Sequence, residues 1–123
     1  MTMGTDHPMP VTPNKRRTVE FPWPPSCLSP NSTKDRRSTT ETRRNYKMAW
    51  SAMARHKLRG THLDITFHPP DNRRRDLDNM LGSIKYGIDG LAIAMGVDDS
   101  VFSFTIRKGE ARKPHGCVVV EVR

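Results

Sequence analysis

One short stretch of the sequence combines side chains that bind phosphate with side chains that bind divalent cations. Three consecutive arginines at positions 73–75 run directly into Asp76, Asp78 and Asn79. Mg²⁺ usually takes one or two carboxylates from a protein, together with water and substrate phosphate. Arginine holds phosphate oxygens through charge-assisted hydrogen bonds. The stretch therefore predicts a site that holds a metal ion against a polyanion, as a metal-dependent nuclease does.

A second acidic pair, Asp98 and Asp99, follows about twenty residues later. A turn between a helix and a strand explains such a pair by itself, since Gly96 precedes it and aspartate favours turns. If the chain turns back at this point, one carboxylate can return beside Asp76 and Asp78. Three converging carboxylates repel one another strongly unless a cation lies between them. Convergence of this kind would therefore indicate a metal ion.

The pair Asp76 and Asp78 also has a purely structural explanation. Acidic residues are common at the start of a helix, where they cap backbone N–H groups and interact with the helix dipole. The same dipole favours a phosphate at this end of a helix. The preceding arginines, Asn79 and the downstream Lys85 favour the functional interpretation over simple capping.

Composition points to an acidic partner. The chain has 123 residues and a formal net charge of +8, which is the electrostatic signature of proteins that bind nucleic acid. Its two cysteines, Cys27 and Cys117, form neither a disulfide framework nor a zinc motif, and we expect reduced thiols. No signal peptide or membrane-spanning run is visible in the sequence. We therefore expect a cytoplasmic protein.

The elements that must position these residues follow from the hydrophobic pattern. Residues 1–17 predict a disordered basic tail, and residues 18–123 predict a single domain. Apolar residues alternate with polar ones over residues 18–23, 62–67 and 102–106, which predicts three strands, and a last strand is predicted over residues 117–122. Helices are expected from about residue 38 to Gly60 and over residues 76–92. The result is an α+β fold in the order β-α-β-α-β-β, with two helices, a small mixed sheet and a final antiparallel hairpin.

The predicted helix over residues 76–92 carries two stripes. The apolar stripe consists of Leu77, Met80, Ile84, Ile88 and Leu91. The other stripe consists of Asp78, Gly82, Lys85 and Asp89. Lys85 lies about 10 Å along a continuous helix from Asp78 and could reach back to a phosphate there, since side chains lean toward the helix N-terminus.

Four motifs, taken together, resemble one known family. They are Phe-Pro-Trp-Pro-Pro-Ser at residues 21–26, Pro-Asp-Asn-Arg-Arg-Arg-Asp-Leu-Asp-Asn at residues 70–79, Lys85 with Asp-Gly-Leu at residues 89–91, and Val-Asp-Asp at residues 97–99. Their order and approximate spacing resemble RusA-type Holliday-junction resolvases, which are common in phages and prophages. The resemblance runs from about Val19 to the C-terminus, and it would make residues 18–123 a RusA-like endonuclease domain.

The resemblance implies a homodimer that binds four-way DNA junctions and nicks two strands symmetrically with one or two Mg²⁺ ions per active site. The metal-binding catalytic carboxylates would be Asp76, Asp78 and Asp99, and Lys85 matches the family's essential lysine. Asp98 would assist or shape the turn. The chain departs from the best-known bacterial members in having extra residues, at positions 80–84, between Asp78 and this lysine.

The arginine run would grip the DNA backbone beside the metal site. Arg73, Arg74 and Arg75 are expected to contact phosphates, although three arginines in a solvated turn are the simpler alternative. Two other functions also fit the sequence. A basic DNA-binding module would bind DNA without Mg²⁺-dependent cleavage, and a different metal nuclease would cut flaps, ends or RNA in preference to four-way junctions.

Overall fold

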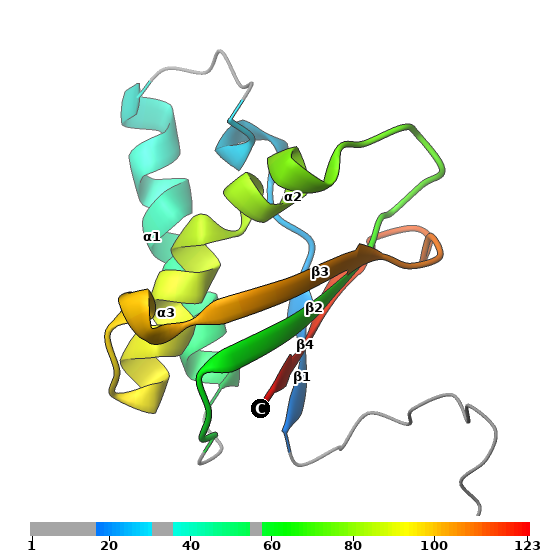
Figure 1. Cartoon of the computed structure of the whole chain (residues 1–123). Helices are drawn as coiled ribbons and strands as arrows, with labels where there is room; N and C mark the ends of the chain where they lie inside the picture. The colour runs from blue at the N-terminus through cyan, green and yellow to red at the C-terminus, as the bar shows by residue number, and fades with distance from the viewer. Residues whose placement is uncertain (1–16, 31–35, 55–57) are drawn as a thin grey trace, which may run out of the picture.

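The computed structural model describes residues 17–30, 36–54 and 58–123, which form a four-stranded sheet with three α-helices (Figure 1). The strands are β1 (Thr18–Pro22), β2 (His62–His68), β3 (Ser103–Lys108) and β4 (Cys117–Val122). The helices are α1 (Arg36–Met53), α2 (Leu77–Ser83) and α3 (Lys85–Met95), with short 3-10 turns η1 (Ser26–Leu28) and η2 (Asp99–Val101). The α+β prediction is confirmed. The predicted disordered tail, apart from Arg17, lies outside the described residues.

The sheet is mixed, as predicted, but its strand order differs from the expected hairpin. The order is β1-β4-β2-β3, with β4 antiparallel to both of its neighbours and β3 parallel to β2. The predicted pairing of the last two strands is therefore wrong. The connection from β2 to β3 contains both α2 and α3, which is long enough for a parallel crossover. β4 takes the central place because its alternate valines, Val118, Val120 and Val122, are completely buried.

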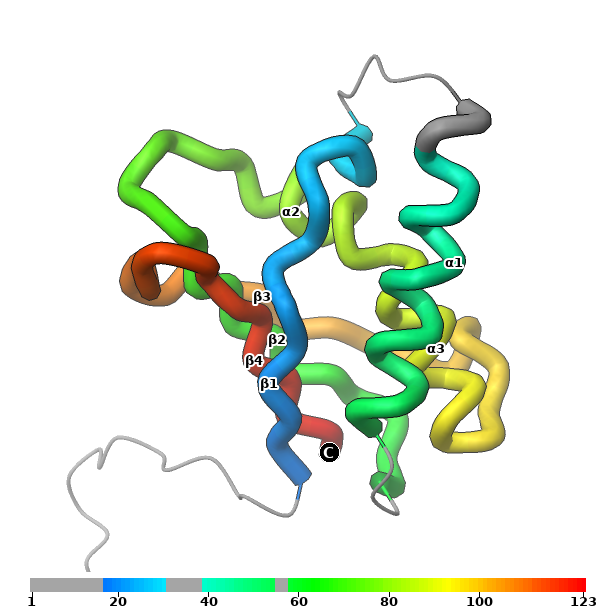
Figure 2. Tube along the Cα trace, turned by 180° about the vertical axis from the view of Figure 1, so that it is seen from behind, coloured from blue at the N-terminus to red at the C-terminus, as the bar shows by residue number. Residues whose placement is uncertain are grey.

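The helices cover one face of the sheet, with α1 and α3 side by side (Figures 1 and 2). The opposite face of the sheet is polar. Asp64 on β2 is almost completely buried there and forms ion pairs with Arg107 of β3 and Arg123 at the C-terminus. His62 is hydrogen-bonded to the hydroxyls of Ser103 and Thr105. Side chains on this second face therefore join β2 to β3 and to the C-terminal residue, in addition to the backbone hydrogen bonds of the sheet.

Two helices, α2 and α3, replace the single helix predicted over residues 76–92. Ile84 separates them, because its backbone (φ −99°, ψ 7°) leaves the helical region while its side chain stays buried. The single-helix prediction fails because the apolar stripe continues across the break and does not reveal it. The burial of Met80, Ile88 and Leu91 is as predicted. The turn lets α2 contact η1 while α3 packs along α1. With three helices, the order becomes β-α-β-α-α-β-β.

Two glycines of α3 allow the close contact with α1. A Cβ at Gly90 would lie 2.0 Å from the carbonyl oxygen of Lys47, and one at Gly87 would lie 2.3 Å from the Trp50 ring. Trp50 is completely buried, and its ring also stacks in parallel on Phe21 of β1, with ring centroids 3.9 Å apart. A single indole therefore joins β1, α1 and α3.

Substituting Gly90 by alanine should destabilise the protein even though alanine is the better helix former. The added methyl would force α1 and α3 apart, at a cost of about 3 kcal/mol, the upper end of the range for overpacked interiors. Chemical denaturation measures this free energy of unfolding. Gly96→Ala is the control, because its Cβ would meet no atom within 4 Å and only the positive φ of 71° opposes it. That strain costs about 1–2 kcal/mol, so a smaller loss at Gly90 than at Gly96 would contradict the packing argument.

Candidate functional site

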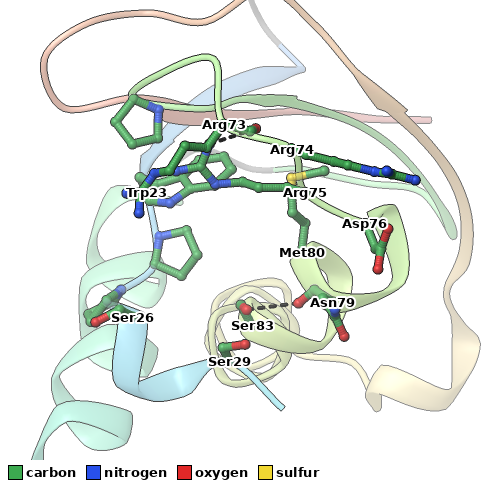
Figure 3. A pocket seen from close by; sticks show the side chains of 13 residues that line it. Trp23, Ser26, Ser29, Arg73, Arg74, Arg75, Asp76, Asn79, Met80 and Ser83 are labelled. Carbon is green, nitrogen blue, oxygen red and sulfur yellow. Dashed lines mark hydrogen bonds between the residues drawn. The ribbon is translucent and has the colours of Figure 1, made fainter. Parts of the chain in front are cut away.

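A pocket of about 690 Å³ opens between the segment that follows β1 and the loop that precedes α2 (Figure 3). Trp23, Pro24 and Ser26 belong to the first segment. Asp76 is the last residue of the loop, and Met80 lines the pocket from α2 itself. All three arginines of the predicted phosphate-binding run line this pocket as well. The structure therefore places the Pro-rich motif and the arginine-aspartate motif, which are far apart in the sequence, against the same cavity.

Trp23 reaches the pocket because β1 ends just before it. Proline has no backbone N–H to donate, so Pro22 and Pro24 limit further strand pairing. The Tyr46 hydroxyl of α1 donates a hydrogen bond of 2.8 Å to the carbonyl oxygen of Pro22 and fixes the end of the strand. Burial raises the pKa of Tyr46 well above its usual value, so the hydroxyl keeps its proton and remains a donor. Trp23 itself packs edge-on against Phe67, with ring centroids 6.2 Å apart.

Asp71 organises the arginine loop. Its carboxylate accepts hydrogen bonds from the backbone N–H of Arg73 at 3.0 Å, from the Arg73 guanidinium at 3.1 Å and from the Arg75 guanidinium at 2.8 Å. These two guanidinium groups, with Arg75 the stronger influence, hold the pKa of Asp71 far below its usual range. Arg75 also lies over the Trp23 ring, 5.6 Å from its centroid, a cation–π contact. We call these contacts of Asp71 with Arg73 and Arg75 the Asp71 clamp. The Asp71 clamp therefore fixes Arg75 against the wall of the pocket.

Arg74 differs from its two neighbours. Within the described part of the chain it has no hydrogen-bond or ion-pair partner, and its side chain extends away from Trp23 (Figure 3). Arg73 is paired but remains 79% exposed. Of the three predicted phosphate ligands, Arg74 is therefore the one whose charge is not already compensated. Arg75 is the one held most firmly within the protein, by Asp71 and Trp23.

Asp76 does not act as the helix cap that would explain it structurally. It occupies the N-cap position of α2 with an extended backbone, yet its side chain makes no capping hydrogen bond to that fully described helix. The carboxylate is exposed and lines the pocket beside the arginines. Asp78 lies in the first turn of α2 and is also exposed. Both carboxylates are available to a ligand.

Asp99 lies elsewhere, next to Asp89 of α3. The Asp89 carboxylate, and to a smaller extent that of Asp98, raises the pKa of Asp99. Asp98 caps η2, because its side chain accepts a 2.9 Å hydrogen bond from the backbone N–H of Ser100, which lowers its own pKa. Asp98 thus shapes the turn, one of the two roles considered for it. η2 packs on α3.

Lys85 begins α3 and is exposed to solvent. The break at Ile84 removes the continuous helix on which Lys85 was expected to share a stripe with Asp78 and reach back to its phosphate. Of the four predicted catalytic residues only Asp76 lines the pocket; Asp78, Lys85 and Asp99 do not. The structure thus brings Asp76 to the arginines but does not gather all the predicted catalytic side chains.

The positions of the acidic side chains determine whether they could bind a magnesium ion. In residues 17–30, 36–54 and 58–123, no group of three or more His, Cys, Asp or Glu side chains is placed to hold a metal ion. Two carboxylates, completed by water and substrate phosphate, are nevertheless sufficient for Mg²⁺. Asp76 and Asp78, both exposed and two residues apart at the start of α2, would have to supply such a pair, whereas Asp99 lies beside Asp89. The donor set therefore fits the ion through Asp76 and Asp78.

Sequence reasoning missed two contributors to this site. Asp71 was not singled out, although its spacing of two and four residues from Arg73 and Arg75 is the signal of an ion-paired loop. Trp23 was noted only as the last apolar residue of the first predicted strand and as part of the Pro-rich motif. Its position in the pocket depends on the contact between Tyr46 and Pro22, which no local pattern reveals.

Replacing Arg75 by glutamine should raise the pKa of Asp71 toward the usual aspartate range, because the strongest influence on the carboxylate is removed. Arg74→Gln is the matched control and should leave this pKa near its native value. A titration of the Asp71 carboxyl by NMR measures both. Since the folded-state pKa is depressed, the clamp stabilises the loop above the unfolded-state pKa of aspartate and is lost as pH falls through the depressed value. Equal shifts in the two variants would contradict the assigned contacts.

Comparison with known proteins gives one informative match. No family model matches the chain. An uncharacterized protein from Xylella fastidiosa (strain Temecula1 / ATCC 700964) is 32% identical over 116 residues, a match that covers 86% of this chain and 75% of that protein. No helix in the described residues is long and apolar enough to cross a membrane. The chain belongs to the same protein family as the Xylella fastidiosa protein.

Proposed function

We propose that this protein is a Mg²⁺-dependent, structure-specific endodeoxyribonuclease that resolves Holliday junctions by paired symmetric nicks during DNA recombination and repair. The observation that carries the proposal is Asp76, a carboxylate at the N-cap of α2 that caps nothing and lines a pocket with three arginines. The choice of a four-way junction as the substrate rests on the four motifs that resemble RusA-type resolvases. Junction cleavage would take place in the cytoplasm of a bacterium or a phage-infected host.

The arginines would position the DNA backbone. Arg74 and Arg73, both exposed, would hold the phosphates that flank the cleaved bond, and the Asp71 clamp would keep the loop in place as they do so. Asp76 and Asp78 would hold Mg²⁺. When bound, the ion supplies a nucleophilic water of lowered pKa and neutralises charge that develops on phosphorus and the leaving oxygen. Asp99 and Lys85 are the other two catalytic residues that the resemblance implies.

Asp78→Asn should abolish Mg²⁺-dependent cleavage of a four-way junction while junction affinity changes by less than about threefold. The carboxamide keeps the shape of the side chain but loses the charge that holds the cation, whereas phosphate contacts made by the arginines supply the affinity. Gel assays of cleavage and of binding measure the two effects. An equal loss of binding and cleavage would contradict this division between carboxylates and arginines.

Glu41→Gln, at an exposed site on α1, is the matched control, since it removes one carboxylate away from the proposed catalytic residues. Cleavage should persist in this variant and be lost in Asp99→Asn if Asp99 acts in the catalytic set. Two rival functions give different results. A DNA-binding module would show binding without cleavage in any divalent metal, and a nuclease for flaps, ends or RNA would prefer those substrates in direct competition.

The homodimer that the resemblance implies would form most readily at β3. Among the described strands it pairs with β2 alone and stands at the edge of the sheet, where its outer backbone groups could pair with another chain. Large apolar side chains are exposed on it and on the adjoining η2, namely Phe104 and Val101, each 42% exposed. A two-fold dimer would match the symmetry of an open four-way junction.

Phe104→Glu should convert the dimer to a monomer, because a charge at the centre of an apolar interface is left desolvated and unpaired. Light scattering coupled to size-exclusion chromatography measures the mass. Met48→Glu, at a position 62% exposed on α1, should leave the mass unchanged. A native protein that is already monomeric at micromolar concentration would contradict dimerisation, and a dimeric Phe104→Glu protein would contradict its placement at β3.

A further inference from the structure

We infer that the pocket receives one unpaired base of the DNA strand, beside the phosphate that the arginines hold. The inference rests on the proposed function and deepens it, because it says which part of the nucleotide enters the cavity. Stacked, paired bases cannot reach such a cavity, so the substrate must present a base that is unpaired or easily displaced. The centre of a branched junction is a place where bases are displaced at low cost.

The walls of the pocket have the chemistry that binds a flat base. Trp23 is half-buried, Pro24 is buried and Met80 is only 4% exposed, so the inner part of the cavity is apolar. The Arg75 guanidinium, held over the Trp23 ring and clamped by Asp71, adds a second planar group to the same wall. Proteins bind unpaired bases by stacking them on aromatic rings and guanidinium planes.

The rim of the pocket carries groups that could pair with a base edge. Ser83 on α2 donates a 2.8 Å hydrogen bond to the carbonyl oxygen of Asn79, so its hydroxyl is already committed. The Asn79 side-chain amide and the Ser26 hydroxyl have no hydrogen-bond partner within the described part of the chain. An amide that offers both donors and an acceptor is suited to the edge of a base.

The two sides of the pocket match the two parts of a nucleotide. Trp23 and Arg75 lie on one side, whereas Asp76 and the extended Arg74 lie on the other (Figure 3). A phosphate held by Arg74 next to Asp76 would therefore place its attached base toward Trp23. The volume of about 690 Å³ is ample for one base with its sugar, and lies within the roughly 300–1,000 Å³ typical of small-ligand sites.

The test compares two duplexes that differ by a single base. Both carry one bulged residue at the same position, which is thymidine in one duplex and a tetrahydrofuran abasic residue in the other. Every phosphate is retained, so any difference in affinity comes from the base. Stacking contributes about 1–3 kcal/mol per base, and therefore native protein should bind the thymidine bulge about tenfold more tightly in fluorescence-anisotropy titrations.

Ser26→Phe fills the pocket from an exposed position and should remove this preference, with affinity for the abasic duplex unchanged. Ala52→Phe, at an exposed site on α1, is the matched control and should keep the preference. Equal affinity of native protein for the two duplexes would overturn the inference, and so would a tenfold preference that survives in Ser26→Phe. Displacement of the thymidine duplex by micromolar thymidine monophosphate would assign the pocket to a free nucleotide and also overturn it.

The proposed function can fail separately from this inference. Equal binding of the two duplexes by a protein that still cleaves junctions with Mg²⁺ would remove the base pocket and leave the nuclease. A protein that shows neither DNA binding nor cleavage would overturn both. The comparison on native protein needs no variant, so a folding defect in Ser26→Phe cannot obscure the result.

Discussion

Packing around the Trp50 indole is the constraint on which the rest of the structure depends. The ring stacks on Phe21 of β1 and fills the space left by the missing side chain of Gly87 on α3. One turn earlier on α1, Tyr46 is hydrogen-bonded to Pro22. These contacts fix the end of β1 against two helices at once. Trp23, the next residue, is thereby placed beside the loop that leads into α2.

The second determinant is the distribution of charge in that loop. Asp71 neutralises much of the arginine charge internally, which lets three consecutive cations remain close together in a defined arrangement. The cost of their mutual repulsion would otherwise favour an extended, variable loop. Arg74 remains uncompensated within the described residues, and Asp76 stands next to it without capping the helix. Arg74 and Asp76 thus offer charges of both signs that are not paired with each other, which suits a substrate that brings phosphate and a cation together.

Local sequence patterns were sufficient to predict the strands and helices that bury only one of their faces. The alternation of polar and apolar residues located β1, β2 and β3, the apolar run of residues 117–122 located β4, and the arginine-aspartate motif was correctly placed at the start of a helix. Strand order was not predictable, because β4 and β3 are separated by a loop that either a hairpin or a crossing connection could use. The break at Ile84 was also hidden, since a buried isoleucine keeps the apolar period intact on both sides. The expected reach of Lys85 toward Asp78 was argued from one continuous helix, which the structure replaces by α2 and α3.

Cleavage of a labelled four-way junction, compared with a linear duplex of the same arm sequence, tests the central claim most directly. With purified native protein and Mg²⁺, the account predicts paired nicks at symmetric positions in opposing strands of the junction, no cuts in the duplex, and no reaction when the metal is chelated. Mg²⁺-independent cutting, or failure to cut the junction with any divalent metal despite tight binding, would contradict the assignment of Asp76 and its neighbouring arginines to a nuclease site.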